Sequence, residues 1–239
     1  MVNRSDERNV LEENYRTIRE NIQKAASDAG RNPEEICFLA ATKTVDAETI
    51  NYAIGLGVRC VGENRVQELL DKYDRLDREH TDCHFIGHLQ ANKVKYIVDK
   101  VSMIHSVDSQ RLAAEIDRQC EKAGRKMNVL VEINIGDEES KSGVRREEAE
   151  ALIREISGFP HLRVRGLMVI PPYTSDKTLT KSYFLQISKL FIDMRGKKID
   201  NVSMDFLSMG MSDDYELAIA SGANIVRIGS ALFGRRSSL

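Results

Sequence analysis

The chain contains 239 residues, of which 41% are apolar and 30% are charged, and its formal net charge is −2. This nearly balanced charge argues against a nucleic-acid partner and against binding to an acidic membrane surface. The apolar content is enough for a substantial core, and chains of roughly 200–250 residues commonly fold as one α/β barrel domain.

Neither export nor membrane insertion is indicated by the sequence. The N-terminus, MVNRSDERNV, is polar and partly acidic, unlike a signal or transit peptide. No apolar run approaches the roughly 20 residues that a membrane-spanning helix needs. The cysteines form no C-x-x-C pair, and they are Cys37, Cys60, Cys83 and Cys120. We therefore expect reduced, buried thiols in a cytoplasmic protein rather than a disulfide or a metal site.

The first predicted element is a long amphipathic helix within residues 1–31. Apolar residues recur there every three or four positions, namely Leu11, Tyr15, Ile18, Ile22, Ala25 and Ala29. This spacing places them on one face of a helix, and the following Gly30 and Pro33 are typical of a helix end.

Short apolar runs and amphipathic stretches then alternate along the chain. The predicted strands cover residues 36–41, 58–61, 83–86, 103–105, 129–135, 164–170, 204–207 and 225–228. Helices are predicted over residues 46–56, 66–76, 94–101, 112–123, 147–156 and 183–194, and two more follow the last two strands. Alternation of this kind predicts a parallel sheet, and eight strand–helix units predict a closed (β/α)8 TIM barrel with the N-terminal helix beside it.

Residues 1–239 are expected to form a single α/β domain. An open doubly wound sheet is the main alternative, but no G-x-G-x-x-G turn follows the first predicted strand. No linker rich in Gly, Pro or Ser divides the chain. Because functional residues of a TIM barrel lie at the C-terminal ends of its strands, the segments after the predicted strands are the candidate sites.

The most informative of these segments covers residues 204–234, MDFLSMGMSDDYELAIASGANIVRIGSALFG. Two predicted strands end there in turns of small residues, at positions 208–212 and 229–230. Each turn begins a helix, whose first backbone N–H groups and dipole favour phosphate. Many TIM barrels bind phosphate after strands 7 and 8. Tight turns without any ligand would need the same glycines, so both interpretations stay open.

Lys43 is the strongest single candidate for chemistry. It follows the apolar run of residues 36–41, so we expect it at the mouth of the barrel above an apolar floor. An apolar surrounding disfavours the charged form of a lysine, and a neutral amine can attack an aldehyde to form a Schiff base. Opposite a phosphate site, this chemistry points to a phosphorylated aldehyde such as pyridoxal 5′-phosphate (PLP). The alternative is a lysine that extends to solvent or balances the charge of the phosphate.

An arginine, two histidines and a serine are further candidates for a role in the site. Arg227 shares a face of the last predicted strand with Gly229, because side chains alternate along a strand. If that face points inward, the guanidinium would pair with the phosphate, face a pyridine nitrogen, or form an ion pair with a barrel carboxylate. His84 and His88 flank a turn rather than share a helix face, so no metal site is expected. Ser142 has no His/Asp partner that the sequence places, and no catalytic residue is assigned.

Seven segments of the sequence, in order, resemble the YggS/PROSC family of PLP-binding proteins, also called pyridoxal phosphate homeostasis proteins. The segments are ATKT, VGENRVQEL, HFIGHLQANK, HSVDS, VEINIGDEESKSGV, RGLMVIPP and LSMGMSDDYELAIASGANIVRIGSALFG. The resemblance runs from about residue 36 to residue 234. It implies a PLP barrel of fold type III, related to the N-terminal domain of alanine racemase.

The resemblance also implies roles for individual residues. Lys43 would carry the Schiff base, Asn64 would lie near the cofactor ring, and Met168 would line the pocket. The phosphate cradle would consist of Ser208, Gly229 and Ser230, beside the cofactor-binding residue Met211. Arg227 would face the ring nitrogen or the phosphate.

The implied function is to hold PLP and to serve intracellular PLP homeostasis, by buffering the cofactor or delivering it to apoenzymes. Alanine racemase has a second, β-rich domain that supplies a catalytic tyrosine, and the 239 residues leave no room for it. Robust catalysis is therefore not expected. The protein is expected to be a monomer. The alternatives are a weak PLP-dependent amino-acid racemase or lyase, and a barrel that binds another phosphorylated metabolite.

Overall fold

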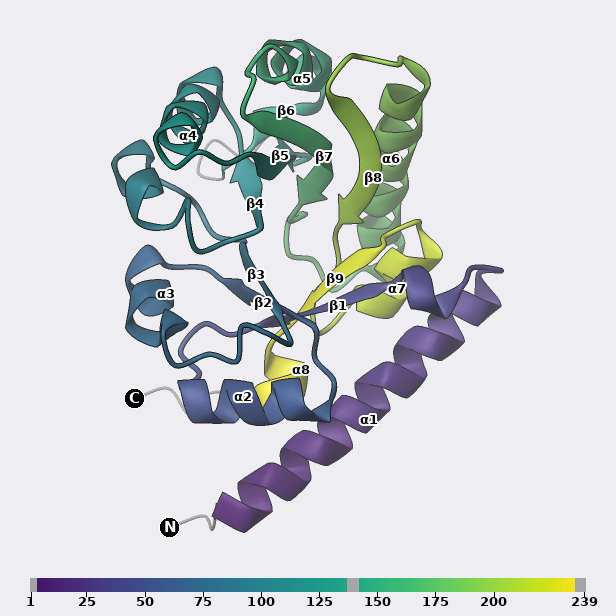
Figure 1. The fold of residues 1–239 in the computed structure, drawn as a ribbon. Helices are drawn as coiled ribbons and strands as arrows, with labels where there is room; N and C mark the ends of the chain where they lie inside the picture. The colour runs from purple at the N-terminus through teal and green to yellow at the C-terminus, as the bar shows by residue number, and fades with distance from the viewer. Residues whose placement is uncertain (1–3, 137–141, 235–239) are drawn as a thin grey trace.

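The computed structural model of the chain describes residues 4–136 and 142–234. Eight parallel strands close into the predicted barrel (Figure 1). They are β1 (Cys37–Ala41), β2 (Cys60–Glu63), β3 (Asp82–Phe85), β4 (Met103–Val107), β5 (Met127–Asn134), β7 (Leu162–Val169), β8 (Val202–Ser208) and β9 (Ile225–Ile228). Pairing of β9 with β1 and of β4 with β5 completes the ring. A two-residue strand that the sequence did not indicate, β6 (Val144–Arg145), pairs with the end of β5.

Helices surround the barrel. The α-helices are α1 (Arg4–Asp28), α2 (Ala47–Leu56), α3 (Val66–Tyr73), α4 (Gln110–Lys122), α5 (Ala149–Ser157), α6 (Lys177–Gly196), α7 (Tyr215–Ala220) and α8 (Ser230–Phe233). Short 3-10 helices are η1 (Pro33–Glu35), η2 (Ala91–Tyr96) and η3 (Arg146–Glu148). The predicted N-terminal helix is α1, which crosses the outside of the barrel and contacts α2, α7 and α8 (Figure 1).

The helix predicted over residues 94–101 is wrong. The structure has η2 followed by turns, in which the N–H of Ile97 donates to the carbonyl of Val94. The apolar spacing that suggested a helix is present, because Val94, Ile97, Val98 and Val101 are all buried. Their branched Cβ atoms lower helix propensity, and tight turns bury the same side chains without a regular helix.

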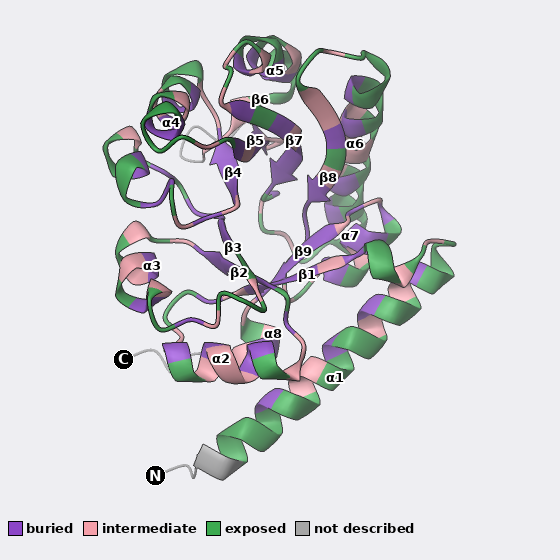
Figure 2. Ribbon diagram, viewed as in Figure 1, coloured by how far each residue is buried: buried purple, intermediate pink, exposed green. Residues whose placement is uncertain are grey.

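Two layers of apolar side chains build the core. The inner layer takes residues from or next to each of the eight barrel strands, including Leu39, Cys60, Ile86, Met103, Leu130, Met168, Phe206 and Ile225. The outer layer joins the opposite faces of the strands to the buried sides of the helices (Figure 2). Side chains alternate along a strand, so a residue two positions away from an inner-layer residue on the same strand also points inward. By this rule the polar residues His84, His105, Glu132, Ser208 and Arg227 also lie inside the barrel.

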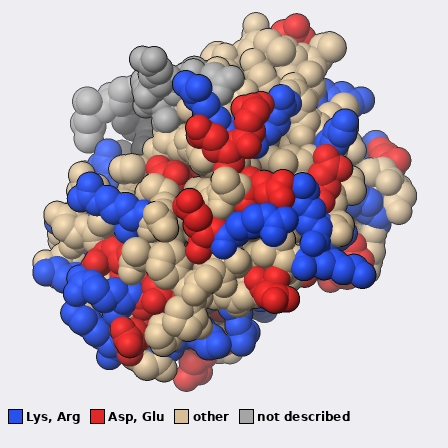
Figure 3. Space-filling view, turned by 90° about the horizontal axis from the view of Figure 1, so that it is seen from above, with Lys and Arg blue, Asp and Glu red and all other residues tan. Residues whose placement is uncertain are grey.

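The outer surface carries charges of both signs. On the face seen in Figure 3, Lys and Arg side chains are interleaved with Asp and Glu, and no large area of one sign is visible. Within residues 4–136 and 142–234, none of the helices is both long enough and apolar enough to cross a membrane.

The N-terminus of the long helix α6 is capped by an aspartate side chain. Asp176 precedes it, and its Oδ1 accepts hydrogen bonds from the N–H groups of Thr178 at 2.8 Å and Leu179 at 3.3 Å. Loss of such a cap lowers stability by about 1 kcal/mol. We expect Asp176→Ala to lower the free energy of unfolding in urea by this amount. The exposed Asp193→Ala on the same helix is the control, and an equal loss there would contradict a capping role for Asp176.

Candidate functional site

A cavity of about 970 Å³ opens at the C-terminal ends of the barrel strands. This volume lies near the upper end of the roughly 300–1,000 Å³ that is typical of small-molecule sites. Its floor and walls include Ala41, Asn64, Ile86, Arg227 and Gly229, which end or follow β1, β2, β3 and β9. The cavity continues outward between α1 and α2, where Leu11 and Tyr52 line it.

Six of the eight residues predicted for the cofactor site line this one cavity. They are Lys43, Asn64, Met211, Arg227, Gly229 and Ser230. The other two lie elsewhere. Met168 is fully buried in the inner layer of the barrel, and Ser208 is fully buried on β8. The structure therefore brings together residues from both ends of the chain, as the barrel prediction requires.

Lys43 lies in the turn between β1 and α2, and its side chain is exposed at the cavity. The expectation that an apolar floor desolvates its amine is therefore wrong. The strand before it is buried, but the backbone turns outward after Thr42 and carries Lys43 with it. The next residue, Thr44, has a φ of +60°, which is uncommon for a side chain branched at Cβ.

Asn64 presents an unsatisfied acceptor. It directly follows β2, and its Oδ1 atom is buried with no hydrogen-bond partner among the described residues. The atom itself is buried, so it does not face the open space of the cavity, although other atoms of Asn64 line that space. A buried polar atom without a partner is unusual in proteins, and a ligand would reach this one only after the Asn64 side chain moved.

The two turns of small residues after β8 and β9 are joined by a serine that sequence reasoning missed. The Oγ of Ser212 accepts hydrogen bonds from the N–H groups of Gly229 and Ala231, both at 3.2 Å. Ser212 lines the cavity, whereas the hydroxyl of Ser208 points into the barrel. Ser208 was predicted, with Gly229 and Ser230, to form a phosphate cradle, but of the two serines in this turn it is Ser212 that lines the cavity.

Arg227 is buried on β9 and is held by two acceptors. One of its terminal nitrogens donates to Ser208 Oγ at 2.7 Å, and the other donates to the carbonyl of Val169 at 3.0 Å. Burial lowers its pKa to about 10, against the opposing charges of Glu132 and Asp214, so the guanidinium stays charged at neutral pH. Among the described residues no carboxylate lies within ion-pair distance of it. A fixed cation therefore faces the cavity.

A chain of hydrogen bonds runs from Arg227 through the interior of the barrel. A guanidinium only donates, so Ser208 Oγ accepts from Arg227, and its own hydroxyl is free to donate to His105 Nδ1 at 3.1 Å. His105 Nε2 lies 3.0 Å from His84 Nδ1. Burial lowers the pKa of His84 to about 4 and that of His105 well below its usual range, so both imidazoles are neutral at pH 7. The chain fixes Arg227 without placing a second charge beside it.

Glu132 is a buried acid that the sequence did not single out. It points inward from β5 with 7% of its surface exposed. Its pKa is raised to about 7, first by burial and then by the nearby carboxylate of Asp108, while the charge of Arg227 opposes the shift. Its only signal in the sequence is a charged residue in a strand that is otherwise uncharged.

Metal binding has no support in the part of the chain that the structure describes. No group of three or more His, Cys, Asp or Glu side chains there is placed to hold an ion. His84 lies in the interior chain, and His88 contacts Ser142, with His88 Nδ1 3.1 Å from Ser142 Oγ. Ser140 and Lys141, which belong to the segment VEINIGDEESKSGV of the family resemblance, lie outside the described residues.

Comparison with known proteins places these features in a family. Residues 14–237 match the family described as alanine racemase, N-terminal domain. A pyridoxal phosphate homeostasis protein of Aquifex aeolicus (strain VF5) is 44% identical over 219 residues, which cover 92% of this chain and 95% of the relative.

Two solved structures are similar over nearly the whole chain. An unknown protein from Bifidobacterium adolescentis has a TM-score of 0.91 and 34% identity, and the match covers 97% of each chain. PipY of Synechococcus elongatus PCC7942, solved with PLP bound, has a TM-score of 0.78 and 32% identity, covering 90% of this chain and all of PipY. The chain therefore belongs to the alanine racemase N-terminal domain family and, within it, to the pyridoxal phosphate homeostasis proteins.

Proposed function

We propose that this protein binds PLP at the mouth of the barrel through Lys43 and serves PLP homeostasis without robust catalysis of its own. The support from relatives is the name shared by the curated proteins and the PLP bound in PipY. The observation in this chain that carries the proposal is one cavity lined by Lys43, Asn64 and the joined turns after β8 and β9.

The residues of the cavity suit the chemical groups of PLP. When bound, PLP supplies an aldehyde that condenses with a primary amine and releases water. Lys43 provides that amine, and the polar residue Asn64 lines the same cavity. The two joined turns, with Ser212 after β8 and with Gly229 and Ser230 after β9, form the proposed phosphate site.

Arg227 bears on the chemistry that the bound cofactor would support, in a way that a racemase and a holding protein would share. A permanent cation near the pyridine nitrogen keeps that nitrogen unprotonated, which weakens the ring as an acceptor of electrons from a substrate. The buried contacts to Ser208 and Val169 fix the guanidinium in place. We propose that Arg227 faces the ring nitrogen, and that Met211 and the inner-layer residue Met168 shape the apolar surroundings of the site.

Mass spectrometry after borohydride reduction tests the proposal directly. Purified protein is incubated with PLP, reduced and digested, and the labelled peptide is identified. One PLP group on the peptide that contains Lys43 is expected. Absence of label, or label confined to other lysines, would overturn the assignment.

A weak amino-acid racemase or lyase is the second candidate, because the chain belongs to the family of the racemase domain. A tyrosine lines this cavity too, Tyr52, and its hydroxyl donates a hydrogen bond to Glu12. Chiral analysis of alanine after long incubation separates the two functions. Turnover well above that of free PLP would replace the homeostasis role with an enzymatic one.

Three properties of the protein in the cell complete the proposal. We place it in the cytoplasm because all four cysteines are free, as expected in a reducing compartment. It acts as a monomer, which light scattering would check. Its partners are PLP-dependent apoenzymes that take up the cofactor, and activation of such an apoenzyme by the PLP-loaded protein would show this transfer.

A further inference from the structure

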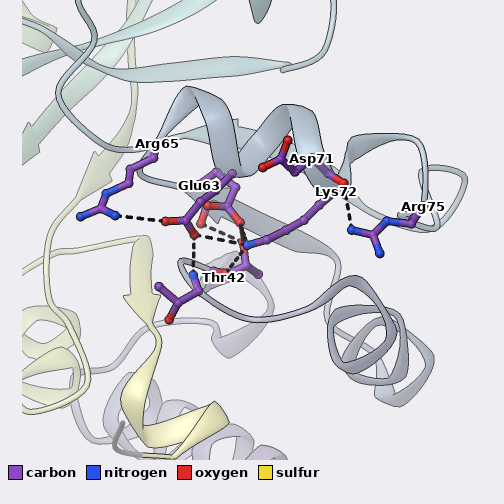
Figure 4. A network of polar contacts seen from close by, with 9 residues as sticks. Thr42, Glu63, Arg65, Asp71, Lys72 and Arg75 are labelled. Carbon is purple, nitrogen blue, oxygen red and sulfur yellow. Dashed lines mark hydrogen bonds and ion pairs between the residues drawn. The ribbon is translucent and has the colours of Figure 1, made fainter. Parts of the chain in front are cut away.

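The turn that carries Lys43 is anchored from the side away from the cavity (Figure 4). Thr42 is buried, its N–H donates to the carbonyl of Gly62 at 2.9 Å, and its hydroxyl donates to Glu63 Oε1 at 2.7 Å. Glu63 ends β2, so these contacts tie the start of the turn to the neighbouring strand. Lys43 follows directly, and its side chain lines the cavity.

Lys72 reaches the same point from helix α3 (Figure 4). Its side chain is 9% exposed, and its Nζ donates to the carbonyl of Thr42 at 2.9 Å and to Glu63 Oε1 at 2.7 Å. A buried ammonium with three donors is satisfied only in a specific arrangement of acceptors. The carbonyl immediately before Lys43 is one of them, so the position of that peptide group is tied to Lys72.

Glu68 holds the other side of the turn. Its Oε2 accepts a hydrogen bond from the N–H of Thr44 at 2.5 Å and lies 3.5 Å from Lys72 Nζ. Thr44 has a φ of +60°, a conformation that side chains branched at Cβ rarely adopt. The contact to Glu68 stabilises that unfavourable backbone, and both neighbours of Lys43 are thereby fixed.

We propose that Lys72, Glu63 and Glu68 are positioning residues, which hold residues 42–44 so that the amine of Lys43 meets the aldehyde of PLP. This inference rests on the proposed function, in which Lys43 is the site of attachment. None of the three residues lines the cavity, so they act on the ligand only through the turn. A lysine side chain has many rotamers, and a fixed backbone raises the fraction of them in which the amine reaches its target.

A purely structural role for this cluster makes a different prediction. An ion pair that only joins α3 to the barrel would affect stability, or would affect all ligands of the cavity alike. A positioning role affects the covalent step alone. Pyridoxine 5′-phosphate distinguishes the two, because it shares the ring and phosphate of PLP but has no aldehyde.

Glu68→Leu is the main test. Glu68 is the more distant of the two carboxylates near Lys72, at 3.5 Å, so its loss leaves the 2.7 Å contact between Lys72 Nζ and Glu63 Oε1 in place. Because the N–H of Thr44 then loses its acceptor, the rate of PLP attachment to Lys43 is expected to fall by about tenfold. Affinity for pyridoxine 5′-phosphate should not change. Glu68→Gln keeps an acceptor oxygen for the N–H of Thr44 and should restore most of the rate.

The control is Gln67→Leu, an exposed residue of α3 whose side chain contacts Asp71 and not the turn. It should attach PLP at the wild-type rate. Thr44→Gly is a second variant that removes no charge; because Thr44 itself lines the cavity, affinity for pyridoxine 5′-phosphate is measured for this variant as well. Glycine adopts a φ of +60° freely, so the protein should fold, but the looser turn should attach PLP more slowly.

The outcomes separate this inference from the function on which it rests. The positioning role is overturned if Glu68→Leu and Thr44→Gly attach PLP at the wild-type rate. It is also overturned if Glu68→Leu weakens pyridoxine 5′-phosphate binding as much as PLP attachment. If the wild-type protein carries no PLP on Lys43 after reduction, the proposed function itself has failed.

Discussion

Replacing Lys43 with alanine is expected to abolish the covalent attachment of PLP. The wild-type protein should show a visible absorbance band on addition of PLP, and the band should be absent from Lys43→Ala. The physical reason is that alanine removes the primary amine and leaves the rest of the cavity in place. Because Lys43 is exposed, its loss creates no internal void, and the unfolding temperature should stay within a few degrees of the wild type.

Two controls make this prediction specific. Lys189→Ala removes an exposed lysine from α6, away from the cavity lining, and should leave the band unchanged. Pyridoxine 5′-phosphate should bind both the wild type and Lys43→Ala, because the proposed phosphate turn does not involve Lys43. A Lys43→Ala protein that still carries PLP after borohydride reduction would show that another lysine is the site of attachment.

Glu132→Gln is expected to make the PLP-free protein more stable than the wild type at pH 8 but not at pH 4. The pKa of Glu132 is raised from 4.5 to about 7 in the folded protein, mainly because the carboxylate is buried. Between pH 4.5 and about pH 7, Glu132 of the folded protein keeps a proton that the unfolded chain has lost. The free energy of unfolding therefore falls as pH rises through this window, by up to about 1.4 kcal/mol per pH unit.

Glutamine has no proton to lose, so the variant lacks this dependence. The difference in the free energy of unfolding, variant minus wild type, should rise from pH 4.5 to about pH 7 and then level, with a total of at most about 3 kcal/mol. Urea denaturation at a series of pH values measures it. Glu155→Gln, on the exposed side of α5, is the matched control. A difference that is constant from pH 4 to pH 8 would mean that Glu132 is already ionised at low pH.

The buried histidines His84 and His105 change the free energy of unfolding with pH in the opposite direction. Burial lowers the pKa of His84 from 6.5 to about 4, so the unfolded chain binds a proton in this window that the folded protein does not. Their contribution to stability is present above pH 6.5 and is lost as pH falls toward 4. Comparing Glu132→Gln with the wild type cancels this contribution, because both proteins keep His84 and His105.

Residues of the candidate site could be predicted where one short segment of sequence shows both the strand and the polar residue that follows or belongs to it. Lys43 stands at the end of an apolar strand, and Arg227 and Gly229 are two residues apart on the last strand. The resemblance to PLP-binding proteins then named the ligand. Ser230 was predicted and lines the cavity, but Ser212, which lines it too, was missed. Ser208 and Ser212 lie in one turn, and only the path of the backbone after β8 decides which hydroxyl meets the cavity.

Contacts between distant segments could not be predicted in the same way. His105 and Ser208 are 103 residues apart, and Lys72 reaches the carbonyl of Thr42 across 30 residues. Nothing in the spacing of these residues indicates that they meet. Their contacts depend on the register of neighbouring strands and on the tilt of α3 against the barrel.

The sequence by itself determined the alternation of strands and helices, the number of barrel strands and the segments that meet at the mouth. These follow from periods of two and of three to four residues, which are local properties of the chain. Only the tertiary structure decided that Lys43 is exposed, that Ser212 faces the cavity and that the 42–44 turn is held from behind. Those features depend on which side chains pack against each turn, and the packing is set by closure of the whole barrel.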